Sequence, residues 1–205
     1  MARQTQTQTE EQVAEKETGK TELRMALGDF KAHVARAVAC TRPKENNFMA
    51  LVSFEGERIF GTDGYVAYGG RLPFRVPAPV LVRARELQDV LKWGGTRDED
   101  MAVELEVRMC GTLTECLVVR FDHKRLVLLS LTGTPYVRVE SVFDVSELKP
   151  CTIPFTARGE VYARVLKTAG DVDVTLFQGE KTYTCMMLEC KTPGREGIFV
   201  LSGLA

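Results

Sequence analysis

The hydrophobic pattern from Thr21 onward predicts one structural unit that occurs three times in succession. The first copy begins with a strand-like segment, continues with a segment that has apolar residues on one helical face, and ends with three strand-like runs. Its predicted strands are 22–27, 48–54, 58–61 and 65–71, and its predicted helix is 28–40. The apolar residues at helical spacing are Phe30, Val34, Ala37 and Val38. Gly28 or Asp29 is expected at the helix N-cap, and Pro43 after its end.

The second and third copies repeat this order of one strand, one helix and three strands. The second is expected to contain strands 80–83, 103–109, 113–121 and 125–131 and helix 84–93. The third is expected to contain strands 151–155, 172–178, 182–189 and 198–201 and helix 157–169. Gly94 and Gly170 are expected to end two of the helices. Any α+β protein has strands and helices in some order, but three successive β-α-β-β-β units favour an internal repeat.

The first twenty residues differ from the rest, because they are mostly Gln, Thr, Glu and Lys with few apolar side chains. Such a segment buries too little surface to offset the entropy of ordering it, so we expect 1–20 to be a disordered arm. The first two units then form one domain at 21–149, and the third unit occupies 150–205.

The overall composition is that of a soluble globular protein, with 44% hydrophobic and 27% charged residues. No apolar run is long enough to span a bilayer, and we expect a cytoplasmic protein without a membrane partner. A net charge of −1 means that any contact with nucleic acid must come from a local patch. The six cysteines form no Cys-x-x-Cys pair, so we expect reduced, buried thiols rather than disulfides or a metal site.

Catalytic chemistry is not indicated by the motifs in this chain. There are two histidines; His33 is expected to be a partly exposed structural residue on a helix, and His123 a turn residue. No phosphate-binding loop or dinucleotide-binding signature is present. We therefore expect a protein that is not an enzyme and that uses no cofactor.

The segment Thr62-Asp63-Gly64-Tyr65 lies between two strand-like runs, where an Asp-Gly step predicts a hairpin turn. Further along the chain come Gly133-Thr-Pro-Tyr-Val-Arg-Val139 and the C-terminal Phe199-Val-Leu-Ser-Gly-Leu-Ala205. In this order and spacing, these pieces resemble the bacterial DNA polymerase III β sliding clamp family. The resemblance implies an α+β DNA-clamp fold of repeated half-domain units, with sheets outside and helices lining the inner face.

The resemblance also implies a pocket for short peptides from partner proteins, such as a DNA polymerase or other proteins with a clamp-binding motif. Its expected residues are Phe48, Thr62, Gly64, Tyr65, Val66, Ala67, Pro135, Arg138, Val139, Val200, Leu201 and Leu204. The chain departs from the family pattern at three places. Val66-Ala67 replaces Arg-Leu, the run that begins at Pro135 is one residue short, and Ser202-Gly-Leu-Ala205 replaces Met-Pro-Met-Arg.

Cations recur on all three predicted helices and their flanks. In a clamp-like ring, such residues would face duplex DNA and contact its phosphates without sequence preference. The candidates are Lys31, Arg36, Arg42, Lys44, Arg85, Lys92, Arg158, Arg164 and Lys167. Ordinary solubilising charge on exposed helix faces is the alternative for each of them.

Three functions follow as hypotheses. The first is a sliding-clamp-like processivity factor for DNA replication or repair. Twelve half-domain units per ring and three per chain give a homotetramer as the favoured homo-oligomer. The second is a clamp-like interaction protein, a scaffold or decoy that binds clamp partners or a clamp, without DNA encirclement. The third is an unrelated α+β ligand-binding module with the same order of elements.

Overall fold

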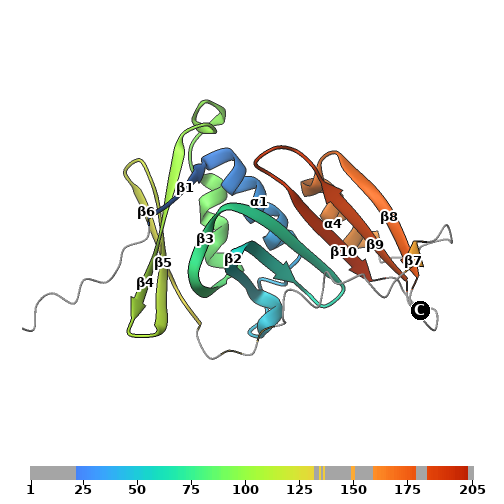
Figure 1. The fold of residues 1–205 in the computed structure, drawn as a ribbon, viewed down its shortest axis with the longest axis horizontal. Helices are drawn as coiled ribbons and strands as arrows, with labels where there is room; N and C mark the ends of the chain where they lie inside the picture. Colours follow the sequence, from blue (N-terminus) through green and yellow to red (C-terminus); the bar gives the residue numbers. More distant parts are fainter. Residues whose placement is uncertain are drawn as a thin grey trace, which may run out of the picture.

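The computed structural model describes residues 22–131, 134, 136, 149–150, 159–178 and 184–202, which form two antiparallel sheets (Figure 1). The four-stranded sheet has the order β1-β4-β5-β6, and the six-stranded sheet has the order β2-β3-β10-β9-β8-β7. The strands of the first sheet are β1 (Glu22–Ala26), β4 (Ala102–Cys110), β5 (Leu113–Phe121) and β6 (Lys124–Leu129). Those of the second are β2 (Leu51–Thr62), β3 (Val66–Arg83), β7 (Lys149–Pro150), β8 (Val172–Gln178), β9 (Thr184–Cys190) and β10 (Gly197–Ser202).

Two longer helices accompany the sheets, and both were predicted within two residues of their described ends. They are α1 (Leu27–Ala39) and α4 (Gly159–Ala169). The N-cap of α1 is Ala26, without a side-chain hydrogen bond, and not Gly28 or Asp29. Asp29 lies instead in the first turn, where its negative charge is favourable beside the free backbone N–H groups.

The prediction of one regular helix at 84–93 is wrong. Four residues form α2 (Ala84–Leu87), and the chain then tightens into the 3₁₀-helix η2 (Gln88–Lys92). Two further 3₁₀ turns are η1 (Phe48–Ala50) and η3 (Thr96–Asp98). Gly94 follows η2 with a positive φ of 59°, which suits the predicted role of this glycine at a helix end.

The strands predicted around 48–83 merge into two long strands that pair with each other. The ladder runs from the pair Leu51 and Arg83 to the pair Thr62 and Ala67. Register shifts on both sides of Gly56, which has a φ of 56°, take up the irregular stretch as bulges. The sequence predicted separate strands on the two sides of Gly56, but pairing between β2 and β3 keeps each of them continuous. Phe48, predicted to lie on a strand, belongs to η1.

The first two units exchange their opening strands. The opening strand of the first unit, β1, pairs with β4 of the second, from Glu22 opposite Glu106 to Ala26 opposite Ala102. The opening strand of the second unit, at the end of β3, pairs in return with β2 of the first. Neither sheet is therefore made by one unit alone.

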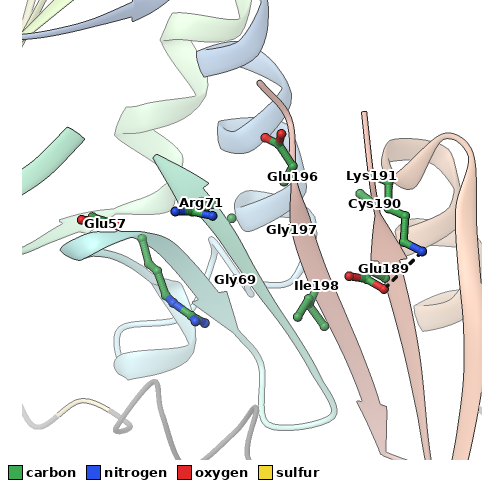
Figure 2. Close-up of a pocket in the computed structure, with 11 residues that line it drawn as sticks. Glu57, Gly69, Arg71, Glu189, Cys190, Lys191, Glu196, Gly197 and Ile198 are labelled. Atoms are coloured by element: carbon green, nitrogen blue, oxygen red, sulfur yellow. Dashed lines mark ion pairs between the residues drawn. The ribbon is translucent and has the colours of Figure 1, made fainter. Parts of the chain in front are cut away.

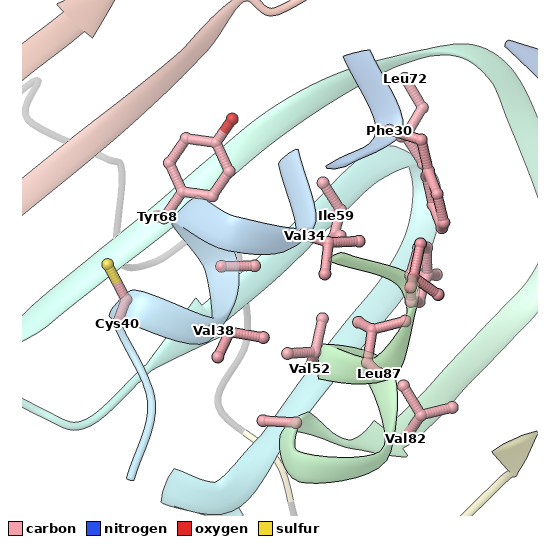
Figure 3. Close-up of a cluster of buried hydrophobic side chains, with 14 of the residues drawn as sticks. Phe30, Val34, Val38, Cys40, Val52, Ile59, Tyr68, Leu72, Val82 and Leu87 are labelled. Atoms are coloured by element: carbon pink, nitrogen blue, oxygen red, sulfur yellow. The ribbon is translucent and has the colours of Figure 1, made fainter. Parts of the chain in front are cut away.

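Helix α1 lies at the centre of the molecule and contacts β2, β3, β4, α2, η2 and α4. Its side chains Phe30 and Val34 are fully buried among residues of both sheets and of α2, such as Val52 and Leu87 (Figure 3). Burying a side chain of this kind stabilises the fold by roughly 1.5–3 kcal/mol. A helix with apolar neighbours on most sides is a core element, and α1 leaves little surface for another partner.

The third unit joins the first through a continuous sheet and a polar seam. Strand β10 pairs with β3, and Arg36 of α1 donates hydrogen bonds to the carbonyl oxygens of Thr168, Ala169 and Arg195. Two of these carbonyls end α4, where a cation is favourable. Arg195 pairs with Asp29 at 2.7 Å. Arg36 is buried, so it holds α1 to α4 and is not available to DNA phosphates.

The histidine and cysteine predictions hold in part. His33 is completely buried, not partly exposed, because its ring lies between Tyr68 and the backbone of Gly194. His123 lies in the turn between β5 and β6, as predicted. Cys40, Cys116, Cys185 and Cys190 are buried, whereas Cys110 is exposed and Cys151 lies outside the described residues. Among the described residues, no helix combines the length and apolar character needed to cross a membrane.

Candidate functional site

The turn between β2 and β3 is built by its own side chains. Gly64 has a φ of 84°, which confirms the predicted Asp-Gly turn. The Thr62 hydroxyl donates to the Val66 carbonyl at 2.9 Å and accepts from the Gly64 amide at 3.1 Å. Asp63 Oδ1 accepts the amides of Tyr65 at 3.0 Å and Val66 at 3.1 Å. The local sequence therefore fixes the backbone of the turn.

Two arginines that were expected to contact DNA lie beside this turn. Arg164 Nη2 of α4 donates to Asp63 Oδ2 at 2.6 Å, and Arg42 Nε lies 3.7 Å from the same oxygen. Asp63 is 1% exposed, so its carboxylate needs a partner of opposite charge. The guanidinium of Arg42 also lies over the ring of Tyr65, 5.6 Å from its centroid.

Tyr65 is the large side chain of the turn that reaches solvent, with 37% of its surface exposed. A neighbouring side chain, Met49 of η1, approaches the backbone of Gly64, since a Cβ on that glycine would lie 4.0 Å from Met49 Cε. Phe48 precedes Met49 and is half-buried. The first predicted wall of the pocket thus comes together around an exposed aromatic ring.

Strand β10 brings the C-terminal candidates next to the turn. Val200 lies opposite Ala67 and Leu201 opposite Val66, and the Ser202 amide donates to the Tyr65 carbonyl at 2.9 Å. Because side chains alternate along a strand, Ala67 and Val200 share one face of the sheet while Val66 and Leu201 share the other. Two of the three predicted walls are therefore adjacent.

The third predicted wall is represented by Tyr136, which the sequence reasoning missed. Its ring meets Phe60 edge-on at 5.8 Å and packs on Ala67, and its hydroxyl donates to the carbonyl of Leu51 at 3.3 Å. Burial raises the pKa of this hydroxyl. Tyr136 was detectable as the aromatic residue of the family-like run at 133–139. Pro135, Arg138, Val139 and Leu204 lie outside the described residues.

A hollow of about 700 Å³ continues along the same face of the six-stranded sheet (Figure 2). Its floor contains Gly69 and Ile198, which lie opposite each other two residues along the strands from Ala67 and Val200. Charged side chains of both signs surround it: Glu57, Arg58, Arg71, Glu189, Lys191 and Glu196. This volume lies within the range of ligand pockets. The sequence signal for it is glycine within a strand, which removes a side chain from the sheet surface.

Several of the predicted DNA-binding cations contact groups within the protein. Besides Arg36, Arg42 and Arg164, Lys31 donates to the Trp93 carbonyl at 2.9 Å. Lys92 pairs with Asp89, and Arg85 lies 4.0 Å from Glu86, although exposed pairs of this kind leave the cations solvated. Lys44 and Lys167 are exposed, and Arg158 lies outside the described residues. The side chains that α1 leaves half-buried include Ala32, Ala35 and Ala39, which carry no charge.

Comparison with known proteins finds neither a family whose sequence profile matches the chain nor a matching curated protein. Solved structures do match. The Borrelia burgdorferi DNA polymerase III β subunit, solved with a natural product, has a TM-score of 0.66 at 10% identity over 94% of this chain and 66% of its own. The Bacillus subtilis sliding clamp has a TM-score of 0.59 at 11% identity, and the match covers 91% of this chain and 65% of that clamp. The Helicobacter pylori β clamp, solved with a DNA ligase peptide, has a TM-score of 0.58 at 8% identity, and the match covers 90% of this chain and 66% of that clamp.

These matches extend over most of the present chain, which spans about two-thirds of the length of the clamp chains. The identities of 8–11% carry information on the fold alone. The resemblance in the sequence is thereby confirmed. The chain has the fold of the DNA polymerase III β sliding clamps.

Proposed function

We propose that this protein is a clamp-like tether, which captures a short peptide from a DNA polymerase or repair enzyme on the surface beside the Thr62–Tyr65 turn. The pairing of β3 with β10 carries this proposal, because it places Val200 beside Ala67 across a long separation in sequence. No reaction is assigned to the protein: its part is to hold an enzyme in place.

The chemistry of this surface suits an apolar linear motif. Tyr65 supplies an exposed ring, and Tyr136, which packs over the buried Phe60 and Ala67, supplies a second, partly buried ring. Sites of this type recognise peptides through a few apolar anchors. The structure of the Helicobacter pylori clamp with a DNA ligase peptide supports a peptide as the ligand.

A titration with labelled peptides tests the tether. We expect a fluorescent decapeptide with Gln, Leu and Phe anchors to bind saturably. Tyr65→Ala should lower the affinity for this peptide at least tenfold, which is about 1.4 kcal/mol. The matched control is Leu113→Ala, which removes an exposed apolar side chain from the β4–β5 hairpin. Absence of saturable binding to the wild type would reject the surface beside the turn as a peptide site.

Encirclement of duplex DNA by a homo-oligomer is the second part of the proposal. The fold supports it, since rings are built from repeats of this unit, and four chains of three units supply twelve. Retention on nicked circular DNA tests encirclement directly: a ring stays on the circle and is released when the DNA is linearised. Equal release from both substrates would show that no ring surrounds the DNA.

A clamp-like interaction protein that does not encircle DNA is the alternative. The observation in its favour is that four candidate cations are engaged within the protein: Arg36 is buried, Arg42 and Arg164 lie beside Asp63, and Lys31 donates to the Trp93 carbonyl. A protein that binds the peptide and is not retained on circular DNA would fit this alternative. The peptide titration and the retention assay together separate the two functions.

A further inference from the structure

Asp63 belongs to an exposed turn, yet its carboxylate is buried and joins two distant parts of the chain. Oδ1 accepts the amides of Tyr65 and Val66, and Oδ2 accepts Arg164 Nη2 of the third unit at 2.6 Å. The same carboxylate therefore fixes the backbone of the turn and binds α4. A movement of α4 away from the turn would leave the carboxylate without its nearest cation.

Arg42 is the weaker partner of this carboxylate. Its Nε lies 3.7 Å from Oδ2, and the same guanidinium also lies 3.4 Å from Glu45. The two arginines are exposed to nearly the same extent, 36% for Arg42 and 34% for Arg164, so it is the shorter distance to Asp63 that distinguishes Arg164. The short hydrogen bond from Arg164 is the charge-assisted contact that compensates the burial of Asp63.

One atom of Arg164 points to the same role. The side chain as a whole is 34% exposed, but its Nε atom is buried and has no hydrogen-bond partner among the described residues. Such a group costs free energy, and a purely packing role at this position of α4 would suit an apolar side chain better. The ion pair between Arg164 and Asp63 offsets the free-energy cost of the unpaired Nε atom.

We propose that Arg164 is a positioning residue, which holds the Thr62–Tyr65 turn in the conformation that binds a peptide and so places peptide binding under the control of the third unit. This inference rests on the proposed tether function. When Arg164 is paired, Asp63 keeps the amides of Tyr65 and Val66 bonded and Tyr65 stays at the peptide-binding surface. When the pair is broken, the carboxylate turns toward water and releases both amides.

A matched control exists at the same seam. Arg195 of the third unit pairs with Asp29 at 2.7 Å near the start of α1, whereas the Asp63 pair lies near Cys40 at its end. The two sites are separated by roughly 15 Å along the helix. Arg195→Gln therefore loosens the third unit without touching the turn, and Arg164→Gln breaks the proposed contact.

Two measurements on the full chain test the proposal: hydrogen exchange of the Tyr65 and Val66 amides, and affinity for the fluorescent decapeptide with Gln, Leu and Phe anchors. We expect Arg164→Gln to speed hydrogen exchange of both amides at least tenfold and to lower the affinity for the peptide at least tenfold. Arg195→Gln should change each by less than twofold. Equal effects of the two variants, or unchanged exchange in Arg164→Gln, would overturn the proposal.

The two possible failures remain distinguishable. A wild type that binds no peptide rejects the tether function, while amide exchange still decides whether Arg164 holds the turn. If Arg164→Gln does not fold, the double variant Arg164→Gln/Asp63→Asn removes the unpaired charge and should restore the fold. A double variant that also fails to fold would show that Arg164 acts through packing, against the proposal.

Discussion

At the scale of single residues, His33 shows how a buried polar side chain is held in one protonation state. Its Nε2 lies 3.1 Å from the Gly194 carbonyl, which can only accept, so Nε2 carries the proton. Nδ1 then accepts from the Tyr68 hydroxyl at 2.8 Å. Burial, aided by the charge of Arg36, lowers the pKa of His33 from 6.5 to about 4 despite its hydrogen bond to Gly194.

This pKa predicts a specific acid sensitivity. Between pH 6.5 and about 4 the unfolded chain binds a proton at His33 that the folded chain does not, so folding stability from this residue is present above pH 6.5 and falls through that window. The decrease reaches roughly 3 kcal/mol. Urea unfolding from pH 7.5 to 4.5 should therefore give a steeper decline for the wild type than for His33→Asn. Parallel curves for the two proteins would contradict the assignment.

The turn at Thr62–Tyr65 was predictable from sequence because its conformation is decided locally, by an Asp-Gly step and the side chains beside it. The contact of Asp63 with Arg164 was not, since 101 residues separate them and no periodicity connects them. Arg36 was misassigned for a related reason. A cation on a helix looks the same in sequence whether it faces solvent or the carbonyl end of another helix.

At the scale of elements, strand and helix positions followed from side-chain periodicity, whereas their continuity depended on partners elsewhere in the chain. The predicted strands at 65–71 and 80–83 became one strand because β2 pairs along both. The predicted helix at 84–93 contains Gln88 to Lys92 in a tighter 3₁₀ form, with Val90 buried. Apolar spacing there did not distinguish the two helical forms.

Strand β6 is the element from which we predict assembly. It lies at the edge of the four-stranded sheet and exposes Val127 by 46% and Leu129 by 68%. An apolar edge strand is a surface for pairing with another chain. Replacing both residues with Glu should therefore lower the mass of the homo-oligomer, measured by light scattering after size-exclusion chromatography at tens of micromolar.

The control for this edge is Leu113→Glu, which charges an exposed apolar residue of β5 away from the sheet edge. The melting temperature of all variants should change little, because the replaced side chains are exposed. A wild type of strictly monomeric mass would contradict assembly through β6. So would equal effects of the edge and control variants.

At the scale of the whole molecule, the proposed DNA binding depends on the cations that the fold leaves exposed. We predict that replacing Lys44, Arg85, Lys92 and Lys167 with Gln weakens duplex binding and flattens the dependence of log affinity on log salt by about 0.9 for each phosphate that is no longer neutralised. Fluorescence anisotropy between 25 and 200 mM salt measures this. The control is Arg75→Gln/Arg125→Gln, on exposed strand positions. No duplex binding by the wild type, or equal slopes, would count against an inner DNA-binding face.

The pairing of strands that lie far apart in the sequence has a consequence for how the chain is made. The edge of β3 that pairs with β10 stays unpaired during synthesis until residue 202 has left the ribosome. Likewise, β1 finds its partner only when 102–106 have emerged. Contacts this distant in sequence make folding slow and leave apolar strand edges exposed in the meantime. Nascent chains stalled before residue 197 are therefore the species from which we expect aggregation, and a chaperone that covers strand edges would act there.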